Sequence, residues 1–229
     1  MIRSILGSCL RDFFYAPICC QCSRALESPV SPLCLSCELR LPYACRTFGQ
    51  THNLQARLAG RTRLAASGYF LEFRKGSSGA QLIHQIKYDT ALNLAQYWAQ
   101  VWSRSLTFEG IWQKSILVSV PPNRWKSRLR GYHAACELAD YLGEYLGLDV
   151  NHNLLNRKWI TRSQTRLGRS DRWDNLQGVY RWSGAPIPDT PLILVDDVVT
   201  TGATVEACLK ILQKQTAQPL GLLSLAYTV

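Results

Sequence analysis

Two groups of residues in this sequence could do chemistry, and they lie far apart along the chain. The first is a pair of adjacent carboxylates that follows the apolar run 192–195 and precedes a Thr/Gly turn. Backbone N–H groups and hydroxyls of such a turn can surround a phosphate at the positive end of a following helix. Adjacent carboxylates can accept hydrogen bonds from neighbouring ribose hydroxyls. The segment predicts a sugar-phosphate site formed by Asp196, Asp197, Thr200, Thr201, Gly202, Ala203 and Thr204.

The second group is a set of cysteines near the N-terminus. Two pairs, each with two residues between its members, are formed by Cys19, Cys22, Cys34 and Cys37. Such pairs can close a tetrahedral thiolate site with no open position, so we expect a structural zinc ion. A short segment with few large apolar residues also needs such a staple to fold. Cys20 could replace Cys19, Cys45 is a reserve ligand, and disulfides are the alternative that a reducing compartment disfavours.

A basic stretch at 123–132 lies between an expected strand and an expected helix. It contains four cations and no acid. The acid pair also lies between a strand and a helix, so both segments should meet at the carboxyl ends of the strands. The cations would then lie across the same crevice, where a pyrophosphate would lie. The alternative is a solvated basic turn. Mg²⁺ is expected with a pyrophosphate, because carboxylates alone seldom complete its shell. The candidate residues are Arg124, Arg128, Arg130 and Gly131.

A second basic stretch, 157–172, has six cations and one acid. It could form a lid that closes over a ligand and excludes water. It could also follow a nucleic-acid backbone, with Trp159 or Trp173 available to stack on a base. An exposed loop without contacts is the third interpretation. The candidate residues are Arg157, Lys158, Arg162, Gln164, Arg166, Arg169 and Arg172.

The elements that must position these residues alternate between strands and helices. Such alternation predicts an α/β fold with a parallel sheet and helices on both faces. We expect a cysteine module at 1–45, a linker or short helix at 46–64 and the α/β domain at 65–229. The expected strands are 65–73, 115–120, 178–182, 192–195 and 220–226, and the expected helices are 80–102, 133–147 and 204–214.

Composition limits the classes of protein that this chain can be. Hydrophobic residues make up 47% and charged residues 18% of 229 residues, which excludes a disordered chain. No apolar run is long enough to cross a bilayer, and the N-terminus resembles no signal peptide, so we expect a cytoplasmic protein without membrane insertion. The formal charge of +10 favours polyanionic partners, although charge alone is equally compatible with a basic protein that has none.

The motifs occur in an order that is similar to the ComF family of competence proteins. The string 192–204 resembles the signature of the type I phosphoribosyltransferases, and the resemblance implies that fold. It also implies that Asp196 and Asp197 hold the ribose hydroxyls of phosphoribosyl pyrophosphate, while 200–204 holds its 5-phosphate. Lys87 and Tyr88 resemble a Lys-Tyr element of the family and are assigned to the pyrophosphate side. The family's Phe-Asn-Gln after Arg-Gly is absent, because residues 132–134 are Tyr-His-Ala.

The resemblance implies a role in natural transformation, in which the protein binds phosphoribosyl pyrophosphate and handles incoming single-stranded DNA. A DNA-uptake helicase or a recombination mediator is the partner that the family suggests. An active phosphoribosyltransferase with an unidentified acceptor is the alternative. Transfer requires groups that orient a nucleophile. His84 and His133 are the candidates, and a lone histidine is more often structural.

Overall fold

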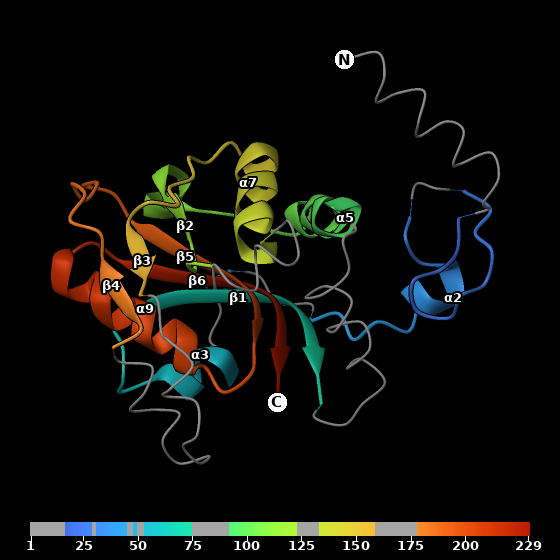
Figure 1. Ribbon diagram of the computed structural model, residues 1–229, viewed down its shortest axis with the longest axis horizontal. Helices are drawn as coiled ribbons and strands as arrows, with labels where there is room; N and C mark the ends of the chain where they lie inside the picture. Colours follow the sequence, from blue (N-terminus) through green and yellow to red (C-terminus); the bar gives the residue numbers. More distant parts are fainter. Residues whose placement is uncertain are drawn as a thin grey trace.

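The chain folds into a three-layer α/β domain with a small cysteine module attached to one side (Figure 1). The computed structural model describes residues 17–28, 31–44, 48–49, 53–74, 92–122, 133–158 and 178–229. Its helices are α2 (Leu35–Glu38), α3 (Asn53–Leu58), α5 (Leu92–Ser103), the 3₁₀ helix η1 (Gly110–Lys114), α7 (Ala134–Leu146) and α9 (Ala203–Gln215). Its strands are β1 (Leu64–Phe73), β2 (Ile116–Ser119), β3 (Leu155–Arg157), β4 (Tyr180–Trp182), β5 (Leu192–Val199) and β6 (Leu220–Thr228).

A parallel sheet with the strand order β1-β6-β5-β2 forms the middle layer. Its central strand β5 is an almost continuous apolar run, as expected for a strand that is covered on both faces. An isolated parallel bridge between Leu117 and Val150 extends the sheet beyond β2. Strands β3 and β4 form a separate antiparallel pair. The predicted α/β class with a parallel sheet is therefore confirmed.

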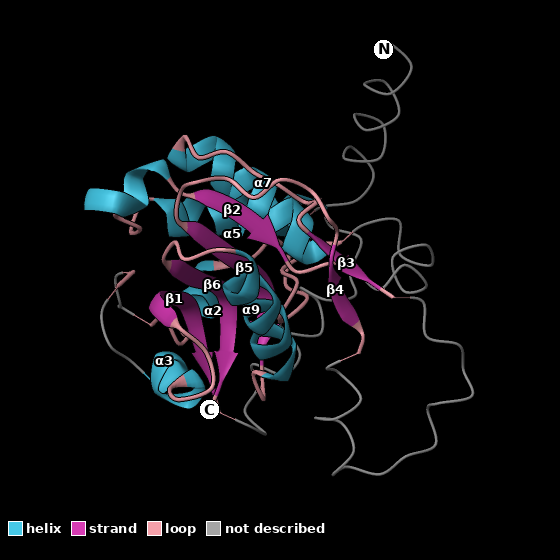
Figure 2. Cartoon of the chain, turned by 90° about the vertical axis from the view of Figure 1, so that its left-hand side faces the viewer, coloured by secondary structure: helices cyan, strands magenta, loops and turns pink. Residues whose placement is uncertain are grey.

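Side chains alternate between the two faces of the sheet and build two cores. Ile193 and Val195 of β5 pack on the face that α5 and α7 cover, together with Trp98 and Trp102. Leu192 and Leu194 pack on the opposite face, which α3 and α9 cover. Figure 2 shows α5 and α7 on one side of the sheet and α3 and α9 on the other.

The predicted elements agree with the structure at most positions. Helix α5 ends where the expected helix 80–102 ends, but residues 75–91 lie outside the described residues. Strand β5 is longer than the predicted 192–195, because it continues through the acid pair to Val199 and stays paired with β6. Within the described part of the chain, no helix has the length and apolar character needed to cross a membrane.

The cysteine module is joined to the sheet by backbone and side-chain contacts. The Ala44 N–H donates to the Phe70 carbonyl at 2.8 Å, and the Glu72 N–H donates to the Pro42 carbonyl at 2.9 Å. The Tyr97 hydroxyl of α5 donates to Glu38 of the module at 2.7 Å. Burial, together with the nearby Glu38, raises the pKa of Tyr97 to about 12. The boundary between module and domain at residue 45 stays a prediction.

Gly143 lies where α7 passes closest to the chain that follows it. A Cβ atom at this position would lie 2.4 Å from Val150 Cγ2 and 2.8 Å from the Leu148 carbonyl oxygen. Overpacking costs about 1–3 kcal/mol, which exceeds the ~0.5–1 kcal/mol that alanine gains over glycine in a helix.

We therefore expect Gly143→Ala to lower the free energy of unfolding by about 1–2 kcal/mol, as measured by urea denaturation. Gly178→Ala is the matched control, since a Cβ atom there meets nothing within 4 Å. Equal stability of the Gly143→Ala variant and the unmodified protein would contradict the packing assigned to this contact.

Candidate phosphate loop and metal centre

The acid pair lies at the carboxyl end of the central strand, followed at once by the turn and helix α9. Asp196 is 6% exposed, and Asp197 is half-buried. The side chain of Asp196 accepts from the Asp197 N–H at 3.0 Å, and that of Asp197 accepts from the Val198 N–H at 2.9 Å. These hydrogen bonds hold both carboxylates at the sheet edge where ligands of open α/β sheets bind.

The turn adopts a backbone conformation that suits a bound anion. Gly202 has φ 82° and ψ −3°, in the left-handed region, and is the N-cap of α9. The left-handed conformation there favours glycine, and a Cβ atom would lie 3.3 Å from Leu58 Cδ2. The Ala203 N–H is 3.4 Å from Thr201 Oγ1. The positive end of the 13-residue helix α9 thus lies directly behind the turn.

The hairpin β3–β4 brings a tyrosine and an arginine to the same end of the sheet. Arg157 Nη1 donates to the Tyr180 hydroxyl at 3.3 Å, with the guanidinium carbon 5.4 Å from the ring centroid. Burial raises the pKa of Tyr180 to about 12, although the Arg157 charge and a hydrogen bond with Thr204 oppose this rise. The Asp196 charge raises it as well, so Tyr180 stays a neutral phenol beside the acid pair and the turn.

The predicted basic loop therefore begins later than the sequence indicated. Arg157 is the last residue of β3, and the Lys158 N–H donates to the Val179 carbonyl at 2.7 Å. Arg157 pairs with Tyr180 of β4, whereas Lys158 lies just beyond β3 and has an exposed side chain. Sequence reasoning also missed Tyr180, because a single tyrosine in a short strand carries no motif.

The four predicted cysteines come together in the module. Their sulfur atoms all lie within 4.8 Å of one another, and Cys22 Sγ lies 3.6 Å from Cys34 Sγ. Four thiolates around a zinc ion with bonds of ~2.3 Å lie about 3.8 Å apart, so the cluster has the right size. Cys19, Cys22, Cys34 and Cys37 are all thiols, and no disulfide joins them. Cys19 belongs to the cluster and Cys20 does not, while Cys45 lies outside the described residues.

The thiols of the cluster differ in how readily they lose a proton. Burial, together with hydrogen bonds with Cys22 and Cys34, raises the pKa of Cys37 to about 12. Burial also raises that of Cys19, but backbone hydrogen bonds from Cys34, Cys22 and Gln21 outweigh it and lower its pKa to about 6. A metal must displace the remaining protons, so metal affinity falls as the pH falls.

A chain of polar side chains links β2 to α7, and no sequence motif indicates it. Ser119 Oγ lies 2.8 Å from His152 Nδ1, and His152 Nε2 lies 2.7 Å from Asp140 Oδ1. Ser119 is 1% exposed, so its hydroxyl is closed to a substrate. The chain therefore ties the carboxyl end of β2 to α7. His133 is the N-cap of α7, with Nδ1 3.4 Å from the Cys136 N–H, which is a structural position.

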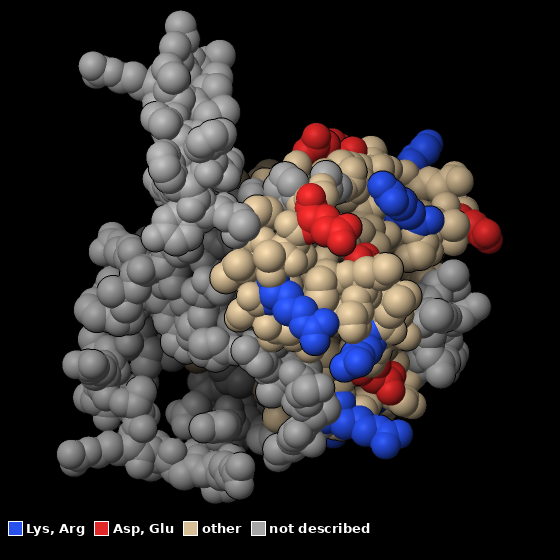
Figure 3. Space-filling model, turned by 90° about the vertical axis from the view of Figure 1, so that its right-hand side faces the viewer, with Lys and Arg blue, Asp and Glu red and all other residues tan. Residues whose placement is uncertain are grey.

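The remaining predicted site residues lie outside the described residues. In the view of Figure 3, acidic and basic side chains of the described part are interspersed, and neither sign forms a continuous patch on that face. The parts that the sequence assigns to these residues stay predictions. The residues are Lys87, Tyr88, Arg124, Arg128, Arg130, Gly131, Arg162, Gln164, Arg166, Arg169 and Arg172, together with the histidine candidate His84.

These features define an α/β protein with a four-stranded parallel sheet, flanking helices and a four-cysteine cluster that could hold a metal ion. No protein-family model matches the chain. The chain is 28% identical over 206 residues to the DNA utilization protein YhgH of Salmonella typhimurium, covering 87% of this chain and 86% of that protein. The corresponding protein of Escherichia coli K12 is 26% identical over 208 residues, with the same coverage.

A third relative is the Competence protein F of Haemophilus influenzae, which is 32% identical over 100 residues. That alignment covers 43% of this chain and 44% of the relative. Together with the parallel sheet and the four-cysteine cluster, these relatives support the assignment of the chain to the ComF family.

Proposed function

We propose that this chain is a competence and DNA utilization protein that binds phosphoribosyl pyrophosphate with Mg²⁺ and single-stranded DNA in the cytoplasm. The names of its relatives support the general role. One observation supports phosphoribosyl pyrophosphate as the ligand. It is the arrangement of β5, the acid pair, Gly202 and α9. It combines two carboxylates for ribose hydroxyls with a helix N-terminus for the 5-phosphate.

The four-cysteine cluster supports a structural zinc ion as the second part of the proposal. Cys19, Cys22, Cys34 and Cys37 are the four ligands, and no position stays open for a substrate. Zinc there supplies no catalysis and holds the module in the shape that packs against β1 and α5. Mg²⁺ would bind together with the pyrophosphate. Phosphate oxygens and waters would be its ligands.

Titration calorimetry of the purified protein with phosphoribosyl pyrophosphate and Mg²⁺ tests the ligand directly. The titration is repeated in the presence of a short single-stranded oligonucleotide. Binding of the sugar phosphate supports the site, and a change in its affinity with DNA present supports a coupled, DNA-directed role. No binding under either condition contradicts the proposal. Release of pyrophosphate in the same samples would support the alternative, an active phosphoribosyltransferase.

The DNA part of the proposal predicts a loss of affinity when Arg162, Arg166 and Arg169 are all replaced by alanine. Each phosphate contact to single-stranded DNA contributes about −0.7 to the slope of log affinity against log salt. We therefore expect the slope to become less steep by about 2 and the affinity to fall on the order of 10- to 100-fold. Fluorescence anisotropy of a labelled oligonucleotide at several salt concentrations measures both quantities.

The matched control removes the same number of positive charges from exposed residues of the described part of the chain. Arg104, Lys114 and Lys214 are exposed and precede β2 or end α9, away from the phosphate loop. Their triple alanine variant should bind DNA as the unmodified protein does. Equal losses in both variants would mean that net charge alone attracts the DNA. An unchanged affinity without the three loop arginines would exclude them as DNA contacts.

A further inference from the structure

Helix α3 lies against the candidate phosphate loop, although it precedes that loop by some 140 residues. Leu54 and Leu58 anchor it, since both are fully buried in the core on the α9 side of the sheet. Leu58 Cδ2 and Arg57 Cδ lie 3.3 and 4.0 Å from the position that a Cβ atom on Gly202 would occupy. The structure thus places part of the predicted linker 46–64 on the turn itself.

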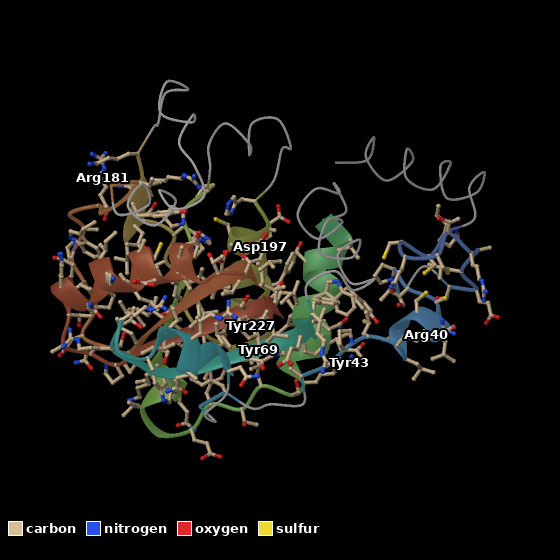
Figure 4. All side chains as sticks on the ribbon, turned by 90° about the horizontal axis from the view of Figure 1, so that it is seen from below. Arg40, Tyr43, Tyr69, Arg181, Asp197 and Tyr227 are labelled. Carbon is tan, nitrogen blue, oxygen red and sulfur yellow. The ribbon has the colours of Figure 1, made fainter. Side chains whose placement is uncertain are left out.

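Arg57 makes a polar contact with the loop that no sequence motif indicates. Its Nη1 donates to the backbone carbonyl of Thr200 at 2.9 Å. Its guanidinium carbon also lies 5.3 Å from the ring centroid of Tyr227, in a cation–π contact. Tyr227 is 1% exposed and packs against Tyr69, with the ring centroids 5.1 Å apart on neighbouring strands (Figure 4). The guanidinium is therefore held between a rigid aromatic pair and the loop backbone.

The first turn of α9 is held by the same segment of the chain. Arg61 Nη1 lies 3.4 Å from Glu206 Oε2, and Lys210 Nζ lies 2.6 Å from Glu206 Oε1. The Glu206 side chain is only 9% exposed. Arg57 of α3 and Arg61, which follows that helix, thus contact the loop before α9 and the first turn of α9. Together they fix how the loop backbone meets the helix.

We propose that Arg57 is a positioning residue of the phosphate loop, which it holds in the conformation that binds a phosphomonoester. By holding the Thr200 carbonyl on the α3 side, the guanidinium fixes the peptide plane between Thr200 and Thr201, and with it the direction of the Thr201 N–H. The planar, permanently charged fork of arginine suits this role, because it donates a hydrogen bond and stacks on Tyr227 at once. The inference deepens the proposed function and rests on it for the identity of the ligand.

Two measurements on Arg57→Ala test this role. The first is the hydrogen exchange of the backbone amides at 200–204 without any ligand, which we expect to be on the order of tenfold faster than in the unmodified protein. The second is the affinity for phosphoribosyl pyrophosphate and for ribose 5-phosphate, which we expect to fall on the order of tenfold. Arg57→Lys keeps the charge and one donor, and should recover part of both.

Arg63→Ala is the matched control from the same segment. Arg63 Nη2 also donates to backbone carbonyls, at Thr216 over 3.2 Å and at Gln213, but these lie at the far end of α9. We expect its removal to leave the loop amides and both affinities unchanged. Equal effects of the two substitutions would mean that segment 53–63 supports the fold in general, and would overturn a specific role for Arg57.

The two readouts separate the inference from the proposed function. If the unmodified protein binds neither sugar phosphate but Arg57→Ala accelerates exchange at 200–204, the proposed ligand is wrong and the positioning role stands. If Arg57→Ala leaves the exchange unchanged, the positioning role is overturned whether or not the ligand binds. Faster exchange with undiminished affinity for a bound sugar phosphate overturns it too, because the loop conformation would then be irrelevant to binding.

Discussion

Replacing Asp196 and Asp197 together by asparagine should weaken the binding of phosphoribosyl pyrophosphate at least about 100-fold. Charge-assisted hydrogen bonds contribute about 1.5–3 kcal/mol each, and the double change weakens those to the ribose hydroxyls. A loss of ~3 kcal/mol corresponds to roughly 100-fold in affinity. Asparagine keeps the shape of the side chain and an acceptor oxygen for the Asp197 and Val198 N–H groups. Titration calorimetry measures the affinity.

The matched control for this pair is Asp189→Asn. Asp189 lies before the start of β5, at the opposite end of the strand, where its carboxylate accepts from Gln218 Nε2 at 2.6 Å. This variant should bind the sugar phosphate normally. Circular dichroism and thermal melting show whether the double variant is folded. A folded double variant with undiminished affinity would remove the acid pair from the binding site.

The second large effect is expected on removal of the metal from the cysteine cluster. Binding of structural zinc contributes about 10–16 kcal/mol in small zinc modules at neutral pH, which is comparable to the whole stability of a domain. Cys37→Ser should therefore abolish stoichiometric zinc and unfold residues 17–44. Because Cys19, Leu33 and Leu41 pack into the core on the α5 side, the melting temperature of the whole protein should fall as well.

Elemental analysis of the purified variants measures the zinc content. Cys20→Ser is the control, because Cys20 is adjacent to the cluster but is not one of its four ligands. This variant should keep one zinc ion per chain. Lower pH should release zinc from the unmodified protein, since protons compete for the four thiolates. Unmodified protein without zinc, or Cys37→Ser with a full equivalent, would contradict the assignment.

Local patterns were sufficient for most helices and strands and for the two clusters of chemical groups, although they did not indicate η1 or β3. The apolar run 192–195, the acid pair and Gly202 lie within one short segment, so their mutual placement depends on few torsion angles. The two cysteines of each pair are also close in sequence, so the spacing within the pair nearly determines how they are placed relative to each other. Chain alternation also indicated the parallel sheet, since a helix that connects two neighbouring strands returns the chain to the end of the sheet where the first strand began.

The length of β5 and the start of the basic loop could not be read from local patterns. Asp196–Val199 stay in the strand because β6 offers backbone partners there, at Ser224, Ala226 and Tyr227. Arg157 belongs to β3 because β4 pairs with that strand across some 20 intervening residues. Hydrogen bonds between distant segments decide both boundaries, and residue propensity does not.

What the sequence determined by itself was the class of fold, the acid pair with its turn, and the four cysteines of the cluster. Only the tertiary structure decided which residues from elsewhere contact them: Tyr180 beside the turn, Arg57 on the Thr200 carbonyl, and the chain from Ser119 through His152 to Asp140. Each of these contacts joins segments that are 12 to 143 residues apart. Such contacts form when apolar faces pack on both sides of one sheet and bring distant segments together. Local patterns indicate that packing, but the side chains that meet depend on how the segments are arranged in space.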